Sequence, residues 1–167
     1  IWERISNNTN AVLRKWYLQH LTAKLKRYEA AQLNRCDILV PISERDLSRF
    51  RALGARGVTA VTPIGIDPAA YRPDYRSFQA PTTVSFIGSL DWMPNQEGLR
   101  WFLGKVWNQV KHDAGLTLHI AGRNTPDWLL RARMKNVVVH GEVADAVDFI
   151  NHHSIMVVPL LSGSGMR

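Results

Sequence analysis

The sequence predicts an α/β fold that holds parts of two domains, each with a parallel sheet and helices on both faces. Short apolar strands alternate with helical segments along most of the chain, as they do where strands are buried on both sides. A proline-rich stretch at residues 68–81 interrupts the alternation, which then resumes. Of the 167 residues, 46% are hydrophobic and 21% are charged. This is the composition of a globular protein, and no apolar run is long enough to span a membrane.

The first expected element is one long helix over residues 11–36, which contain neither Pro nor Gly. Leu18, Leu21, Leu25 and Tyr28 repeat at helical spacing and form one apolar stripe. Two interpretations stay open for this helix. Either the stripe packs on its own domain and the basic side chains are solvated, or residues 11–36 bind an anionic membrane surface.

The charge distribution bears on that choice, because the net charge of +7 is concentrated in the first segment. Residues 1–36 hold seven Lys and Arg against two Glu, whereas the rest of the chain holds fourteen basic against twelve acidic residues. This distribution weakens a nucleic-acid role for the whole chain and leaves an anionic surface or ligand as the partner of the first segment. Cys36 is the only cysteine, so we expect a small buried hydrophobic residue in a reducing compartment, the cytoplasm.

Strands and helices alternate in the rest of the chain. Residues 37–42 form a strand, Ser43 and Asp46 cap the next helix, Gly54 ends it, and residues 58–62 form a second strand. After residue 81 we expect strands at 83–87, 116–121, 137–140 and 155–159, and helices at 96–111, 126–134 and 143–151. We therefore expect residues 1–67 to be the end of one domain, 68–81 a linker, and 82–167 the first part of a second domain.

The carboxyl ends of the second series of strands predict a binding site. Ligands of open parallel sheets sit beyond these ends, and each of the four strands is followed by a glycine: Gly88, Gly122, Gly141 and Gly163. Glycine lets the backbone come close to an anion. Four glycines at equivalent places are a stronger signal than any one of them.

Three segments supply candidate phosphate-binding residues. Gly88 and Ser89 open a loop that runs to Asn95, which we expect to cap the next helix; Asp91 is interpreted as a turn residue rather than a catalytic base. Arg123 stands where its guanidinium would donate two hydrogen bonds to a diphosphate. The last segment suits an anion site because it has little bulk to pack. Its candidate residues are Ser162, Gly163, Ser164, Gly165 and Arg167. A tight turn at Gly88 and a solvated Arg123 are the alternatives.

Gly141, Glu142 and Val143 are the candidate base-binding residues, because a glycine turn lets the backbone lie against a flat base. A Glu142 that merely caps the following helix is the alternative. The histidines are scattered along the chain without metal-binding spacing, so we expect neither a metal nor a cofactor. They are His20, His112, His119, His140, His152 and His153. No nucleophile-elbow, P-loop or paired-carboxylate motif is found.

Taken together, five segments resemble the group 1 (family 4) glycosyltransferases, which have two Rossmann-like domains in the GT-B arrangement. The segments are 36–46 (CDILVPISERD), 62–73 (TPIGIDPAAYRP), 86–95 (FIGSLDWMPN), 141–145 (GEVAD) and 158–167 (VPLLSGSGMR). Each is weak alone, but their order is specific. The resemblance implies that Gly88 matches the first donor-domain turn, Gly141 and Val143 the base-contacting turn, and Gly163 and Gly165 the donor loop.

The resemblance implies a retaining, metal-independent transfer of a sugar from a nucleotide diphosphate sugar to a saccharide or lipid-linked acceptor. This hexosyltransferase-like activity would serve polysaccharide or glycolipid synthesis. Many members carry Arg and Lys in the loop where this chain has Ser89 and Asp91, so phosphate neutralisation falls on Arg167, Arg123 and helix N-termini. The family's histidine and carboxylate pair are not found, so no catalytic residue is assigned. We expect an internal fragment that is inactive alone.

Two other functions stay open at this point. The first is a sugar-nucleotide epimerase or a non-catalytic nucleotide binder, because one fold serves several functions. The second is a peripheral membrane or nucleic-acid interaction module built on residues 11–36. The leading hypothesis is the donor-binding half of a cytoplasmic glycosyltransferase, for which we expect no nucleic acid as a partner. A peripheral position on the inner face of the membrane stays open as an alternative.

Overall fold

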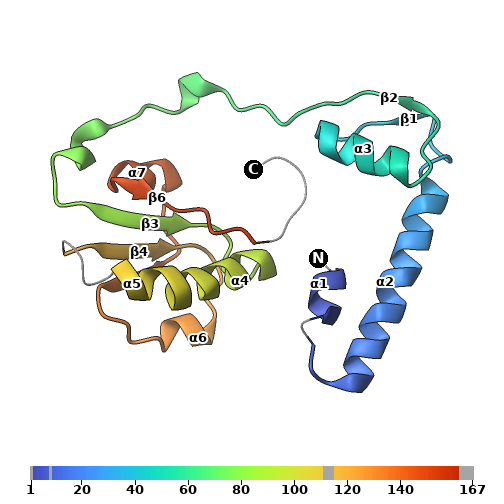
Figure 1. Cartoon of the computed structure of the whole chain (residues 1–167). Coiled ribbons are helices and arrows are strands. Elements are labelled where there is room, and N and C mark those ends of the chain that lie inside the picture. The colour runs from blue at the N-terminus through green and yellow to red at the C-terminus, as the bar shows by residue number, and fades with distance from the viewer. Residues whose placement is uncertain (1, 8, 111–114, 162–167) are drawn as a thin grey trace. The chain divides into compact units, whose positions relative to one another are not determined.

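The structure is a computed structural model that describes residues 2–7, 9–110 and 115–161 (Figure 1). The described chain divides into two compact units between Ile66 and Asp67. Each unit combines helices with a parallel sheet.

The first unit contains the long helix and a small parallel sheet. Its elements are α1 (Trp2–Asn7), α2 (Val12–Gln32), β1 (Ile38–Leu39), α3 (Glu44–Ala52) and β2 (Val58–Thr59). β1 pairs with β2 in parallel, and α3 is the connection between them. The predicted cap is confirmed, since the Ser43 side chain accepts a hydrogen bond of 3.1 Å from the Asp46 N–H. Gly54 follows α3 with a φ of +97°, as expected of a glycine that ends a helix.

The predicted long helix is confirmed over the bounds of α2, but its apolar stripe is only partly packed. Leu18 is buried, whereas Leu25 and Tyr28 are exposed. The prediction that Cys36 is buried is wrong, because this residue lies exposed in the bend between α2 and β1. Among the described residues, no helix is both long enough and apolar enough to cross a membrane.

The second unit is a four-stranded parallel sheet with the strand order β5-β4-β3-β6. Its strands are β3 (Thr83–Ile87), β4 (Thr117–Ala121), β5 (Val137–Gly141) and β6 (Ile155–Met156). Its helical elements are η1 (Pro68–Ala70), η2 (Tyr75–Phe78), α4 (Met93–Trp101), the π-helical turn η3 (Phe102–Trp107), α5 (Asn108–Val110), α6 (Asp127–Leu130) and α7 (Ala146–Asn151). The chain first adds strands on one side of β3 and then returns through α7 to its other side.

Helices cover both faces of this sheet, as predicted (Figure 1). Because side chains alternate along a strand, Phe86 of β3 and Ile120 of β4 point to one face, and Ser85 and His119 to the other. The first face packs against η3 and α6 and forms the core. Its buried members are Val84, Phe86, Leu90, Leu99, Phe102, Leu103, Trp107, Leu118, Ile120 and Leu129. α7 lies on the second face.

Two helix starts differ from the prediction. Asn95 does not cap α4, which begins two residues earlier because Pro94 occupies its first turn, where no backbone N–H is needed. The Asn95 amide instead donates to the Ser89 carbonyl at 2.9 Å. α7 starts at Ala146 rather than at residue 143, because the Asp145 side chain accepts from the N–H groups of the first turn at 2.7 and 3.0 Å.

The predicted linker, residues 68–81, contains the turns η1 and η2 and is bound to α7. Asn151, the last residue of α7, donates a hydrogen bond of 3.0 Å to the Arg72 carbonyl. Beyond the helix, the Ser154 hydroxyl donates to the Ser77 carbonyl at 3.0 Å. The later part of this stretch is therefore fixed on the second unit.

Candidate functional site

A cavity of about 310 Å³ lies at the carboxyl ends of β3, β4 and β5. Five residues predicted from the sequence line it together: Gly88, Ser89, Arg123, Glu142 and Val143. They come from three loops that are far apart along the chain. This is the edge of an open parallel sheet at which ligands bind.

The loops after β3 and β4 are held together by backbone hydrogen bonds. The Gly88 N–H donates to the Ala121 carbonyl at 3.2 Å, and the Leu90 N–H donates to the Arg123 carbonyl at 3.0 Å. Gly122 makes this close approach possible, since a Cβ at that position would lie 1.8 Å from the Gly88 carbonyl oxygen. Its φ of +152° is also a conformation that other residues rarely adopt.

A side-chain contact joins the same two loops. The Asn124 amide donates a hydrogen bond of 2.8 Å to the Asp91 carboxylate. Asn124 has a φ of +56°, a conformation that asparagine tolerates better than most residues. Asp91 thus connects one loop to the other, which agrees with its interpretation as a turn residue.

The third loop is attached at Gly141. The Gly122 N–H donates to the Gly141 carbonyl at 2.7 Å. Gly141 does not itself line the cavity, but its φ of +72° turns the chain so that Glu142 and Val143 do. The structure therefore places the phosphate-binding and base-binding candidates of these loops on one cavity.

The charges around the cavity are few. Of the described residues that line it, Arg123 is the only cation and Glu142 the only acid, and both side chains are exposed. The predicted help from helix N-termini is limited at α7, because Asp145 already accepts from its first-turn amides. At α4, Pro94 has no N–H to offer. A bound diphosphate would depend on Arg123 among the described residues.

The candidates Ser162, Gly163, Ser164, Gly165 and Arg167 lie outside the described residues, and their phosphate role stays a prediction. Among the residues that are described, no group of three or more His, Cys, Asp or Glu is placed to hold a metal ion.

Three described histidines of the second unit lie together in space, although they are scattered along the chain. His119 of β4 and His140 of β5 share a hydrogen bond of 2.9 Å between Nδ1 and Nε2, and the His153 ring lies 4.4 Å from the His119 ring. Phe149 of α7 packs edge-on against His140 and His153. The Thr83 hydroxyl lies 3.1 Å from His153 Nδ1. We call His119, His140 and His153 the histidine cluster.

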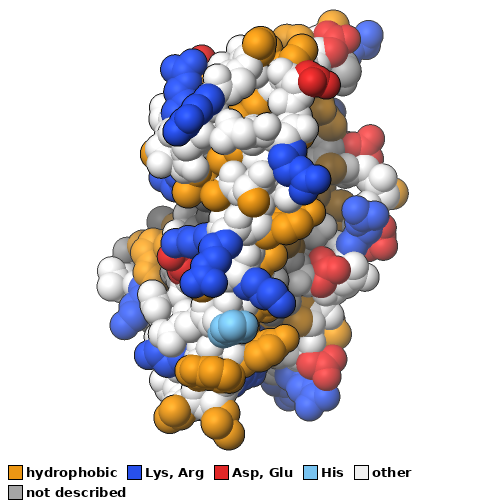
Figure 2. All heavy atoms as spheres, turned by 90° about the vertical axis from the view of Figure 1, so that its right-hand side faces the viewer, with side chains coloured by type: hydrophobic (Ala, Val, Ile, Leu, Met, Phe, Trp, Pro, Cys, Tyr) orange, Lys and Arg blue, Asp and Glu red, His pale blue; other side chains and the backbone are white. Residues whose placement is uncertain are grey.

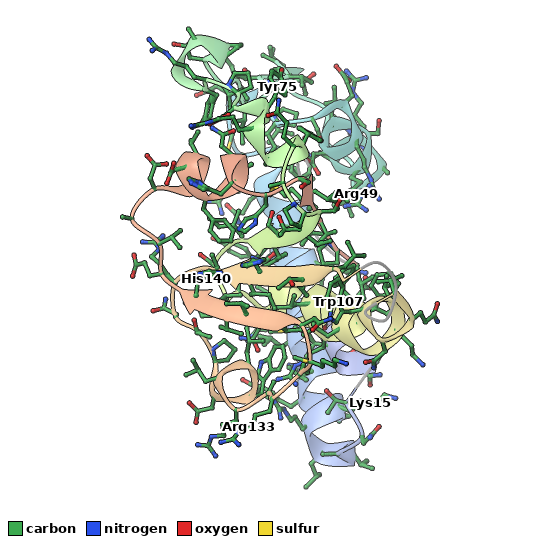
Figure 3. The ribbon with its side chains drawn as sticks, turned by 90° about the vertical axis from the view of Figure 1, so that its left-hand side faces the viewer. Lys15, Arg49, Tyr75, Trp107, Arg133 and His140 are labelled. Atoms are coloured by element: carbon green, nitrogen blue, oxygen red, sulfur yellow. The ribbon has the colours of Figure 1, made fainter. Side chains whose placement is uncertain are left out.

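The histidine cluster lies on the α7 face of the sheet, whereas Trp107 belongs to the core on the opposite face; both His140 and Trp107 are labelled in Figure 3. Burial, together with the neighbouring His140, lowers the pKa of His119. Burial, together with the neighbouring His119, His140 and His152, lowers the pKa of His153 to about 4. The sequence signal was present, since His119 and His140 fall on the same face of two consecutive strands once the strands are aligned in parallel.

Comparison with known proteins identifies the family. The family model described as "Glycosyl transferases group 1" matches residues 81–167, which is just over half of the chain. Curated proteins give no match.

Two solved structures are similar in fold. A crystal structure of TarM has a TM-score of 0.59 and 13% sequence identity, covering 80% of this chain and 27% of TarM. A structure of trehalose-6-phosphate synthase, determined to study enzymatic glycosyltransfer with retention through bisubstrate glycomimetics, has a TM-score of 0.50 and 14% identity. That match covers 78% of this chain and 41% of the synthase chain.

This chain thus spans less than half of either similar structure. At such low identity the two similarities establish the fold alone. They confirm the predicted α/β architecture with parts of two Rossmann-like domains of the GT-B type. The family match and the fold agree, and the chain belongs to the group 1 glycosyltransferases.

Proposed function

We propose that the protein binds a nucleotide diphosphate sugar in the cavity at the ends of β3, β4 and β5 and transfers the sugar to an acceptor. The meeting of three loops on that cavity carries the proposal. Gly88 and Ser89 offer backbone that a ligand can approach closely, and Arg123 offers a charge-assisted donor. We assign Glu142 and Val143, which line the same cavity, to the base.

The chemistry needs stabilisation of the leaving group. A departing nucleoside diphosphate gains negative charge in the transition state, and donors that are already in place stabilise it with little reorganisation. The backbone bonds between the β3 and β4 loops hold the main chain of Gly88 and Arg123 in place before a ligand arrives. We assign Arg123 to the diphosphate, together with Arg167 from the segment after β6.

We further propose that transfer proceeds with retention of configuration and without a bound metal. Retention is supported by the similar trehalose-6-phosphate synthase structure, which is described as an enzyme of glycosyltransfer with retention. The sugar is expected to be a hexose and the acceptor a saccharide or a lipid-linked molecule, in polysaccharide or glycolipid synthesis. We place the reaction in the cytoplasm, at the inner face of the membrane.

The 167 residues alone are not expected to turn over sugar nucleotide. No described residue is assigned as a catalytic group, and the chain spans 27% and 41% of the two similar structures. We propose that transfer needs further parts of the enzyme. Measurable transfer by this chain alone would contradict the expectation that it is inactive, but the proposed donor site would still stand.

Calorimetry tests the donor site. We expect the protein to bind nucleoside diphosphates and to bind inorganic phosphate much more weakly, because phosphate lacks the contacts to Glu142 and Val143. Arg123→Gln should weaken nucleoside diphosphate binding by about tenfold or more, as expected for the loss of a charge-assisted hydrogen bond. Arg133→Gln is the matched control, since Arg133 is exposed and does not line the cavity.

Two results would overturn the proposed site. Equal affinity for nucleoside diphosphate and phosphate would show that no base is recognised there. Equal effects of the Arg123 and Arg133 substitutions would show that the cavity is not where the diphosphate binds.

A further inference from the structure

The cavity at the ends of β3, β4 and β5 has two chemically different sides. The loops after β3 and β4 line it with polar groups, among them Ser89 and Arg123. The chain after β5 lines it with small apolar side chains, among them Val143 and Ala146, and with Glu142. A nucleoside diphosphate is divided in the same way, into an anionic end and a flat ring with a polar edge. The side formed by the chain after β5 therefore suits the ring.

Glu142 is the unexpected residue on that side, because a carboxylate repels a diphosphate. Of the described residues that line the cavity, it is the only acid. Arg123 lines the same cavity, yet the two charged side chains form no ion pair with each other. The opposite charges therefore do not neutralise one another. An acid in such a cavity is favourable only where the ligand brings N–H or O–H donors to it.

The fold itself makes no use of the Glu142 side chain. The N-terminus of α7 is capped by Asp145, whose carboxylate accepts from the N–H groups of Val147 and Asp148. Asp145 thus has the capping role that the sequence also allowed for Glu142. The Glu142 side chain is exposed, and within the described residues it takes part in no hydrogen bond or ion pair. Its carboxylate is available to a ligand.

The main chain next to Glu142 is attached to the loop that carries Arg123. Gly141 directly precedes Glu142, and Gly122 directly precedes Arg123. The Gly122 N–H donates to the Gly141 carbonyl at 2.7 Å, so a backbone hydrogen bond joins the residues that precede the two charged ones. One ligand can therefore meet a cation from the β4 loop and an acid from the β5 loop.

The nucleobases differ in the groups that they present to a carboxylate. Guanine has two adjacent donors, the N1–H and the 2-amino group, which match the two oxygens of a carboxylate. Uracil has one N–H between two carbonyl oxygens. Adenine and cytosine each have a ring nitrogen that accepts hydrogen bonds beside the amino group. Because a carboxylate repels these acceptors, guanine is the base that it favours.

We propose that the donor is a guanosine diphosphate sugar and that Glu142 determines this specificity. The N1–H and the 2-amino group of guanine donate to the Glu142 carboxylate. The ring lies against Val143 and Ala146, and the diphosphate extends to Arg123. The inference rests on the proposed function and deepens it by naming the base of the donor.

Calorimetry with nucleoside diphosphates of equal charge tests the base. The chain has a net charge of +7, and Figure 2 shows Lys and Arg side chains spread over one face of the molecule, so any anionic nucleotide is attracted. Among diphosphates of equal charge, differences in affinity report the base. Guanosine diphosphate should bind about tenfold or more tightly than inosine diphosphate, which lacks the 2-amino group. Uridine and adenosine diphosphate should bind more weakly still.

A substitution at Glu142 tests the residue. Glu142→Gln should weaken the binding of guanosine diphosphate by about tenfold or more, because a neutral amide replaces one of the two acceptor oxygens by a donor. Binding of uridine diphosphate should change by less than about twofold. The matched control is Glu44→Gln, since Glu44 is an exposed acid of α3 that does not line the cavity. This control changes the net charge equally and should leave all four affinities unchanged.

Three results would overturn the inference, and they separate it from the proposed function. If guanosine diphosphate binds no more tightly than uridine diphosphate, but both bind more tightly than inorganic phosphate, the donor site stands and guanine is the wrong base. If Glu142→Gln weakens both nucleotides equally, the carboxylate contacts the ribose hydroxyls, which all four nucleotides share. If no nucleoside diphosphate binds more tightly than inorganic phosphate, the proposed donor site fails together with the inference.

Discussion

The two faces of the sheet in the second unit are built from alternate residues of the same strands, yet they hold different chemistry. One face places Val84 and Phe86 of β3 beside Leu118 and Ile120 of β4, all buried. The other face places His119 of β4 in the histidine cluster. A strand covered on both sides is usually apolar throughout. Here the alternation separates a face that forms the apolar core from a face that carries the histidine cluster, and the candidate donor site lies at the edge that both faces share.

The largest effect expected from this difference is on stability. Leu118→Ala should lower the free energy of unfolding of the second unit by about 2–5 kcal/mol, because Leu118 is fully buried and its removal leaves a cavity. Val138→Ala on the neighbouring strand removes a side chain that is 41% exposed on the opposite face and should cost less than about 1 kcal/mol. Urea denaturation compares the two. Equal losses would show that the faces do not differ as described.

A second prediction concerns the edge where the loops meet. Gly122→Ala should cost about 1–3 kcal/mol of stability, because alanine is strained at this φ, and should also weaken nucleoside diphosphate binding. The added Cβ pushes the β4 loop from Gly88 and moves Arg123. Gly104→Ala in η3 is the control, since no atom lies within 4 Å of its added Cβ. If both variants bind nucleoside diphosphate alike, the close contact of the loops does not organise the site.

A third and smaller effect should appear as a dependence of stability on pH. The pKa of His153 is lowered from 6.5 to about 4 in the folded protein, by burial first and then by the neighbouring histidines. The unfolded chain therefore binds a proton more readily than the folded one. Stability should be fully present above pH 6.5 and should decrease as the pH falls from 6.5 towards 4.

The groups around His153 explain why its pKa is lowered. His119 and His140 face it from the sheet, His152 lies beside it at the end of α7, and Phe149 and Thr83 are uncharged. No carboxylate is among the causes of the shift. Replacing His153 by Leu should flatten the pH dependence of the melting temperature between pH 6.5 and 4, whereas His152→Leu should change it less, since His152 is exposed. If the melting temperature of His153→Leu depends on pH as steeply as that of the unmodified protein, His153 is not the origin of the pH dependence.

Much of the fold and part of the site could be predicted because the signals are local. Strands of apolar residues ending in Gly88, Gly122 and Gly141 were recognisable, and the structure gathers these ends at one edge. The start of α4 was misplaced because Asn95 resembles a cap, whereas Pro94 decided where the helix begins. The helix start was therefore determined by Pro94 and not by the capping preference of Asn95.

Other features depend on pairing that the sequence does not display. His119 and His140 lie on the same face because His119 is paired with Val138 and side chains alternate along β5, so their contact follows from the pairing of β4 with β5. The contact of Gly122 with the Gly88 carbonyl likewise exists only once two loops are placed side by side. The alternation of side chains along one strand can be predicted from the sequence. Contacts between two strands can be predicted only when their register is known.

The smallest predicted effect concerns Asn151, the last residue of α7, which binds the segment that precedes β3. Asn151 binds the preceding segment twice, accepting from the Asp74 N–H at 3.4 Å and donating to the Arg72 carbonyl at 3.0 Å. Asn151→Ala should cost about 1 kcal/mol or less, because these bonds are partly open to water. Its effect should be local: hydrogen exchange of the amides at residues 72–78 should speed up, while exchange in β3 and β4 stays unchanged. Asn108→Ala, on the opposite side of the sheet, is the control and should leave residues 72–78 unaffected. If Asn151→Ala speeds exchange throughout the sheet, the residue supports the α7 face as a whole, and residues 72–78 are not held by this contact alone.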